Sequence, residues 1–202
     1  MKFCKLFFLL ILYISLVDNS FAQGFEAKIF GGINSSQLQG DNLSGFDKIG
    51  LHTGLGVEYG FLKNSIGLEL IFNQKGSASK NDGNNLPQRV STTLNYLQIP
   101  VLYSINSWYN ETNNFYHIGI HAGPYFSTLF STNSSDPGLE RFTDNFRKTD
   151  FGAVFGFQYR ISHNISSILR YDQSFLKIYN NPSNRVSGIL SYLVTLRLEY
   201  YF

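Results

Sequence analysis

The chain has 202 residues, of which 43% are hydrophobic and 15% charged, so it has room for one folded domain and is too apolar for a disordered protein. Its 16 Lys and Arg residues barely exceed its 14 Asp and Glu residues, which excludes the concentrated basic face of a nucleic-acid-binding protein. Aromatic residues reach 16%, well above an ordinary soluble domain, and point toward a membrane or a large apolar surface.

Residues 1–22 have the pattern of a secretory signal peptide, and we assign residues 23–202 to one domain. The positively charged start is followed by an apolar run of about a dozen residues, whereas a membrane-spanning helix needs about 20. The single cysteine, Cys4, precedes this run. The mature chain therefore has no thiol for a disulfide, a metal site or a nucleophile.

Beyond the leader, apolar residues alternate with small or polar ones with a period of two, which indicates β-strands. In the segment 48–61, one face carries Ile, Leu, Val, Tyr and Phe, and the other carries mainly glycine. Eight segments show this alternation, at about residues 25–33, 48–61, 65–76, 91–106, 115–130, 149–162, 165–178 and 187–202.

The connections between the segments alternate in length. Residues 62–64 and 163–164 are tight turns, whereas 34–47, 77–90 and 131–148 are long and polar, and 107–114 is intermediate on the tight-turn side. Alternating short and long connections predict an up-and-down antiparallel order with both chain ends on the tight-turn side.

The nature of the non-apolar face decides between a soluble and a membrane barrel. Glycine with sparse charges is too bare for a solvated exterior, but it suits the narrow interior of an eight-stranded barrel whose apolar face meets hydrocarbon. We therefore predict an all-β, eight-stranded antiparallel up-and-down transmembrane β-barrel in the outer membrane of a Gram-negative bacterium. Its surroundings are then outer-membrane lipid and lipopolysaccharide.

Aromatic residues near the strand ends are expected to form two girdles at the membrane interfaces. The tight-turn girdle is predicted to contain Phe25, Phe61, Trp108, Phe115, Tyr116, Tyr159, Tyr200 and Phe202, and the other Phe72, Phe126, Phe130, Phe151 and Phe175. The aromatic end at Phe202 also resembles the C-terminal signal that the barrel assembly machinery reads during biogenesis.

Strand parity places a set of charged residues inside the barrel, all expected in the half nearer the chain ends. The set is Glu26, Lys28, Glu58, Glu69, Arg160, Arg170, Arg197 and Glu199. Because charges in a low-dielectric interior must be paired, we predict a salt-bridged plug built on Glu58, Glu69, Arg160, Arg170 and Arg197, with Glu199 in the same network. The alternative is a set of independent charges solvated by water in the lumen.

Four short motifs carry a family resemblance: Tyr96 to Leu102 (YLQIPVL), Ala122 to Tyr125 (AGPY), Asp150 to Gly152 (DFG) and Arg170 to Asp172 (RYD). With them, the chain from about Gln23 to Phe202 resembles the PorT-like outer-membrane β-barrel proteins. It departs from the family pattern at Gln98, where the family often has Glu. It also departs at residues 173–175 (Gln-Ser-Phe), where the family has a fuller Gly-Leu sequence after the Arg-Tyr pair. The resemblance implies an outer-membrane barrel, and for the family's namesake an accessory role in protein secretion and gliding.

An enzyme is the third class to consider, because some small outer-membrane barrels hydrolyse lipids with Ser, His and a carboxylate near the outer rim. His52 and Asp172 are expected near that side, but the chain has neither a G-x-S-x-G nor an H-E-x-x-H motif. His117 and His121 are four residues apart on a strand, which separates them by about 13 Å. We predict hydrogen-bonded lumen histidines and no catalytic, cofactor-binding or metal-binding residue.

The acidic residues of the long connections give no calcium-loop spacing and are expected to be solvated. They are Asp41, Asp47, Asp82, Asp136, Glu140 and Asp144.

These observations favour a membrane scaffold or binding barrel with a plugged lumen, whose outer loops or periplasmic rim contact a protein partner. A narrow channel for small solutes and a lipid-modifying hydrolase remain as alternatives. Eight strands enclose a space that side chains just fill, so open diffusion is not expected.

The alternation of connections also predicts the orientation in the membrane. Tags inserted at residue 83 or 138 should be labelled on intact cells, because bacterial barrels place long loops outside and tight turns in the periplasm. Labelling of a tag at residue 163 in their place would reverse the orientation.

Overall fold

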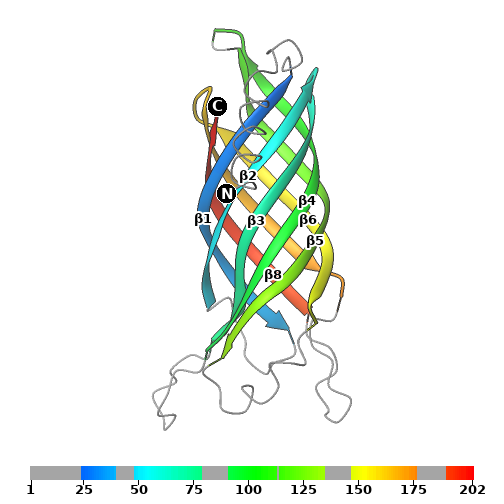
Figure 1. Cartoon of the computed structure of the whole chain (residues 1–202). Coiled ribbons are helices and arrows are strands. Elements are labelled where there is room, and N and C mark those ends of the chain that lie inside the picture. The colour runs from blue at the N-terminus through cyan, green and yellow to red at the C-terminus, as the bar shows by residue number, and fades with distance from the viewer. Residues whose placement is uncertain (1–23, 40–47, 79–90, 113, 135–146, 177–189) are drawn as a thin grey trace, which may run out of the picture.

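The computed structural model describes residues 24–39, 48–78, 91–112, 114–134, 147–176 and 190–202. These residues form a closed barrel in which each strand pairs with the next in antiparallel fashion and the last pairs with the first (Figure 1). The strands are β1 (Phe25–Gln39), β2 (Lys48–Phe61), β3 (Asn64–Ala78), β4 (Ser91–Asn110), β5 (Phe115–Ser134), β6 (Thr149–Arg160), β7 (Ile165–Ser174) and β8 (Leu190–Tyr201). The predicted eight-stranded up-and-down barrel is confirmed.

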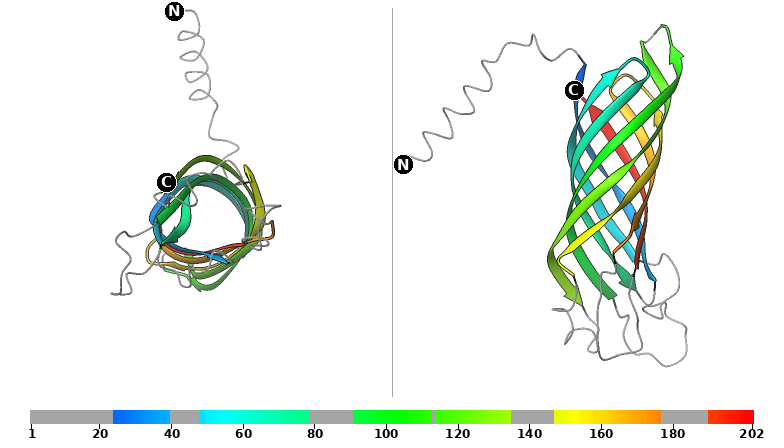
Figure 2. Two further views of the ribbon diagram at one scale, coloured as in Figure 1. Left: turned by 90° about the horizontal axis from the view of Figure 1, so that it is seen from below. Right: turned by 90° about the vertical axis from the view of Figure 1, so that its right-hand side faces the viewer.

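The two ends of the barrel differ. The turns that include residues 62–63, 111–112 and 161–164 lie at one end together with the start of β1 and the end of β8, and we call this the turn end (Figures 1 and 2). The opposite end, where β1 ends and β2 begins, is the loop end. The predicted signal peptide and the tag positions 83 and 138 lie outside the described residues, as do the six acidic residues of the long connections.

Several strand ends differ from the prediction. β1, β3 and β5 run on to Gln39, Ala78 and Ser134, because polar residues there still pair with a neighbouring strand. β6 and β7 stop earlier than predicted, at Arg160 and Ser174. Composition alone does not reveal these ends, since a polar residue at a strand end differs little from a loop residue.

The hairpin of β4 and β5 has the longest strands, 20 residues each, and rises above the other turns (Figure 1). The predicted connection at 107–114 is therefore wrong for residues 107–110, which continue β4. Trp108 has a φ of 59°, so a local irregularity interrupts the alternation there and hides the strand from a period-two search. β3 begins only at Asn64, opposite Ile105, so β4 beyond Asn106 has no β3 partner.

Burial is inverted relative to a soluble protein. On β8, Leu196 and Leu198 are more than half exposed, whereas the residues that alternate with them, Thr195, Arg197 and Glu199, are buried. Outward apolar and inward polar residues are the arrangement of a barrel that meets hydrocarbon. In the described part of the chain, no helix is long and apolar enough to cross a membrane.

Aromatic contacts form at both ends of the barrel. At the turn end, ring centroids lie 4.8 Å apart for Phe25 and Tyr59 and 6.4 Å apart for Phe61 and Tyr103, and at the loop end they lie 5.8 Å apart for Phe72 and Phe130. Phe115 does not belong to the predicted girdle: it is buried and packs against His117. Phe115 has the same inward-facing parity as His117. A position near a strand end is therefore not enough to place a residue in the girdle.

Glycine permits one close approach at the seam between β1 and β8. A Cβ on Gly32 would lie 2.2 Å from the Leu196 carbonyl oxygen and 2.6 Å from Arg197 Cα, whereas a Cβ on the neighbouring Gly31 meets nothing within 4 Å. The strand that carries Arg197 can therefore approach β1 this closely only because residue 32 has no side chain.

Substitution at these two glycines tests the seam. Gly32→Ala should lower the free energy of unfolding by about 1–3 kcal/mol through overpacking, and Gly31→Ala should change it by no more than about 0.5 kcal/mol. Urea unfolding in lipid vesicles measures both. Equal losses in the two variants would contradict the close approach.

Candidate functional site

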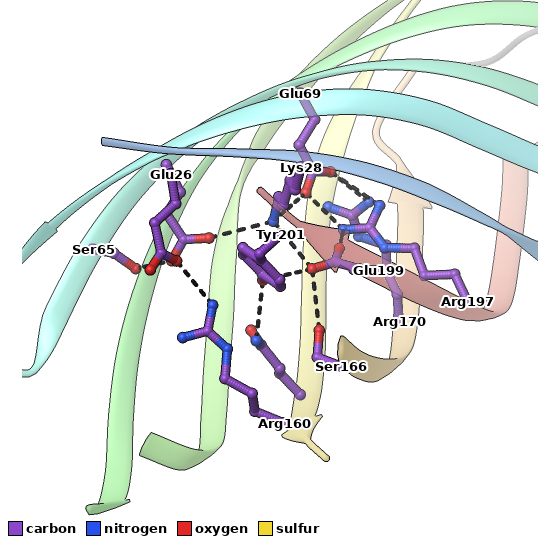
Figure 3. A network of polar contacts seen from close by, with 12 residues as sticks. Glu26, Lys28, Ser65, Glu69, Arg160, Ser166, Arg170, Arg197, Glu199 and Tyr201 are labelled. Carbon is purple, nitrogen blue, oxygen red and sulfur yellow. Dashed lines mark hydrogen bonds and ion pairs between the residues drawn. The ribbon is translucent and has the colours of Figure 1, made fainter. Parts of the chain in front are cut away.

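Glu69 on β3 is the centre of the polar network inside the barrel (Figure 3). Its carboxylate lies 3.0 Å from Lys28 Nζ, 3.0 Å from Arg170 Nη1 and 2.6 Å from Arg197 Nη2. All four side chains are almost completely shielded from solvent. One carboxylate thus binds cations from β1, β7 and β8, and it ties both strands of the closing seam to the opposite wall.

Glu199 is the second buried carboxylate of this cluster. It pairs with Arg197, lies 3.4 Å from Lys28 Nζ and accepts a hydrogen bond of 2.7 Å from the Tyr201 hydroxyl. The Arg197 guanidinium holds both Glu69 and Glu199 and lies 4.0 Å from the centre of the Phe30 ring. A planar guanidinium suits this double pairing, because it presents several N–H donors in a fixed fork.

The remaining two residues of the predicted plug lie nearer the turn end. Glu58 accepts from Ser65 and lies 3.4 Å from Lys28 Nζ, and Arg160 Nη2 lies 2.8 Å from the Glu26 carboxylate. Glu58 and Arg160 do not join the Glu69 cluster directly; Lys28 connects Glu58 to it. Lys28 is therefore a central residue that the prediction left out of the plug, although its parity had placed it inside.

A second charge cluster, made of residues that the predicted set left out, fills the loop half of the lumen. Lys75 Nζ lies 3.1 Å from Asp150 and between the rings of Tyr96 and Tyr125, 4.9 and 5.0 Å from their centres. The Tyr125 hydroxyl and Ser174 also donate to Asp150. Lys75 has the parity of Glu69, and Asp150 that of Arg160, so parity could have identified both.

A row of amides adjoins the Glu69 cluster. Asn34 Nδ2 donates to Asn73 Oδ1 at 2.7 Å, Asn73 Nδ2 donates to Gln98 Oε1 at 3.0 Å, and Gln98 Nε2 donates to Asp172 Oδ2 at 2.9 Å. Asp172 also lies 3.8 Å from Arg170 Nε, which pairs with Glu69 through Nη1. The amide row is therefore joined to the Glu69 cluster through Asp172 and Arg170.

The histidines are parts of the wall and its network. His52 is fully buried; its Nε2 accepts from Arg197 Nη1 at 3.2 Å, since an arginine can only donate, and Nδ1 faces Asn73 Oδ1 at 3.4 Å. His121 lies over Gly156, and His117 Nδ1 lies 3.1 Å from the Arg160 carbonyl oxygen.

His52 and Asp172 do not form a catalytic pair at the outer rim. Both are buried inside the lumen, and Asn73 and Gln98 stand between them in the hydrogen-bonded row. Among the described residues, no group of three or more His, Cys, Asp or Glu side chains could hold a metal ion.

Comparison with known proteins agrees with this architecture. The family model described as "outer membrane protein beta-barrel domain" matches residues 21–180. No characterised protein matches the chain in a sequence search.

Solved structures of outer-membrane barrels are similar in fold. OprG from Pseudomonas aeruginosa is 15% identical, with 89% of this chain and 96% of that chain covered and a TM-score of 0.48. Ail of Yersinia pestis is 12% identical, with 88% and 98% covered and a TM-score of 0.47. Neisserial surface protein A is 11% identical, with 89% and 97% covered and a TM-score of 0.48.

Removal of Arg197 tests the buried cluster. Arg197→Ala leaves Glu69 and Glu199 with less compensation away from water, so the free energy of unfolding should fall by about 3–5 kcal/mol. Arg160→Ala is the matched control, because its partner Glu26 has a 42% exposed side chain, and the loss should be about 1 kcal/mol or less. Comparable losses would mean that water solvates the lumen charges independently.

Proposed function

We propose that this chain, which belongs to the family of outer membrane protein beta-barrel domains, is a membrane scaffold or binding barrel with a plugged lumen. The protein is an integral β-barrel of the Gram-negative outer membrane. Its work is then done at its rims, by contact with other molecules, and not by transport through its interior.

The observation that carries the proposal is the double layer of buried ion pairs. The largest fully buried side chains are Arg170, Arg197, Tyr96, Tyr125 and Lys75. The arginines belong to the Glu69 cluster, and Lys75 and the two tyrosines to the Asp150 cluster. A solute that crossed the barrel would have to break both clusters and leave charges unpaired in a low dielectric, which is costly.

A narrow channel is the second candidate, and one observation favours it. Some buried polar atoms in the lumen have no protein hydrogen-bond partner, including Arg170 Nη2, Thr195 Oγ1 and His121 Nε2. Buried polar groups of this kind usually bind water. Water inside the barrel is compatible with a plug, but a connected water path would allow small ions to pass.

The resemblance to PorT-like proteins supports a finer version of the proposal, in which the barrel is an accessory of protein secretion. Such a role needs a protein partner at the outer loops or at the periplasmic rim. We place the turn end in the periplasm, because tight turns face that side in bacterial barrels. Co-purification from the native membrane would identify a stable partner.

Planar-bilayer recordings test the plug. The wild-type barrel should show no steady conductance, whereas a variant that loses one pair from each cluster, Glu69→Ala, Arg197→Ala, Lys75→Ala and Asp150→Ala together, should conduct. The matched control, Glu26→Ala combined with Arg160→Ala, removes only the ion pair nearer the turn end, and this variant should not conduct. Circular dichroism confirms the β-structure of each variant.

A steady conductance of the wild-type barrel would contradict the plug and support the channel. A closed quadruple variant with intact β-structure would mean that other side chains seal the lumen.

A further inference from the structure

The lumen opens at the turn end into a cavity of about 370 Å³, which we call the turn-end mouth. Its walls come from β1, from the turn between β2 and β3, and from the raised hairpin of β4 and β5. The residues that matter for its chemistry are Glu26, Glu58, Leu62, Tyr109, Tyr116 and Arg160.

The charges that line the mouth do not balance. Two carboxylates, Glu26 and Glu58, face one guanidinium, Arg160. Arg160 pairs with Glu26 at 2.8 Å and lies over the Tyr201 ring, 4.2 Å from its centre. Glu58 has Lys28 at 3.4 Å, but Lys28 is shared with Glu69 and Glu199. Among the charged side chains that line the mouth, carboxylates therefore outnumber cations by two to one.

The accessible part of this charge is Glu26. Its side chain is 42% exposed, against 14% for Arg160 and for Glu58. Arg160 Nη2 contacts only the Oε2 oxygen, and in the described part of the chain Arg160 is the one cation within ion-pair distance of Glu26. A second cation can therefore approach Glu26 from the open side.

Apolar and aromatic groups line the same mouth or adjoin it. The Tyr109 and Tyr116 rings lie 5.0 Å apart at the wall, and Leu62 is 97% exposed at the rim. Trp108, next to Tyr109, is 62% exposed. Exposed Trp and Tyr beside a charged pocket are the residue types that dominate protein-binding energy.

Membrane headgroups do not account for the exposed hairpin. Tyr103 belongs to the turn-end girdle through its contact with Phe61, and Tyr109 lies six residues further along β4. Six residues span about 20 Å along a strand, or about 15 Å along a barrel axis at the usual tilt, whereas a headgroup layer is about 5–7 Å thick. The tip of the hairpin thus reaches the aqueous side, so Trp108 and Tyr116 lie beyond the turn-end girdle in which the sequence analysis had placed them.

We propose that the turn-end mouth binds a lysine or arginine side chain, flanked by apolar residues, on an extended segment of a periplasmic protein. The inference rests on the proposed function only in placing the turn end in the periplasm. Glu26 supplies the charge-assisted hydrogen bond, the tyrosine faces attract the cation, and Leu62 and the hairpin cover the apolar flanks.

Simple strand addition to the hairpin edge is a weaker explanation of the same surface. The part of β4 at residues 107–109, which does not pair with β3, is short and contains the irregular Trp108, and short, irregular edges disfavour pairing with another chain. An anionic ligand is disfavoured by the two carboxylates.

Trp108 is the single tryptophan of the chain and is adjacent to Tyr109 of the mouth, so intrinsic fluorescence reports on the hairpin beside the site. The purified barrel in nanodiscs is titrated with acetyl-Leu-Lys-Leu-amide, acetyl-Leu-norleucine-Leu-amide and acetyl-Leu-Glu-Leu-amide. We expect a saturable change with the lysine peptide, much weaker binding of the norleucine peptide and none of the glutamate peptide. In Glu26→Gln, affinity for the lysine peptide should fall roughly tenfold.

Glu111→Gln is the matched control, because Glu111 is an exposed acid on the same hairpin that does not line the mouth, and it should bind like the wild type. Equal binding of the lysine and norleucine peptides, or an unaffected Glu26→Gln variant, would overturn the proposal. So would a fluorescence change that depends on barrel concentration and not on peptide, which would indicate a second copy. The conductance of the barrel is independent of these outcomes, so failure of the plug is distinguishable from failure of the site.

Discussion

The structure depends on the need to pair charges inside a closed eight-stranded barrel, where little water remains to solvate them. Glu69 meets this need by binding cations from three other strands. The glycines of the inner wall make room for it: a Cβ on Gly56 would lie 3.0 Å from Glu69 Cγ and 3.2 Å from Lys28 Cε. The bare glycine face of β2 and the long charged side chains of its neighbours are therefore two halves of one arrangement.

Period-two alternation was enough to predict the eight strands and the inward face of the charges that were named, because parity in a strand determines the face of each residue. Lys75 and Asp150 have the same inward parity but were left out of the predicted set. The up-and-down order followed from the alternating lengths of the connections. Parity alone does not determine height along the barrel axis. Parity could not show that Lys28 contacts three carboxylates, or that Glu58 and Arg160 lie nearer the turn end than the Glu69 cluster. Those contacts depend on the register between strands distant in sequence and on the reach of flexible side chains, which composition and spacing do not contain.

The four motifs that carry the family resemblance meet in the lumen. Gln98 from the first donates to Asp172 of the last, and Tyr125 of the second donates to Asp150 of the third. Segments far apart in the sequence thus contribute to one polar interior. A role in filling that interior explains why these motifs show no recognisable catalytic pattern. Their polar residues form hydrogen bonds with one another. The motifs therefore indicate how the interior of the barrel is filled, and only indirectly what the barrel binds.

A filled interior moves the question of function to the ends of the barrel, but it does not isolate them from the core. Lys28 contacts Glu58 at the turn-end mouth and Glu69 at the centre, at 3.4 and 3.0 Å. A cation that reached Glu58 in the mouth would compete with Lys28 for that carboxylate and favour the pairing of Lys28 with Glu69 and Glu199. Because Glu69 also holds Arg170 and Arg197, binding at the rim and the strength of the seam between β1 and β8 draw on one shared set of ion pairs.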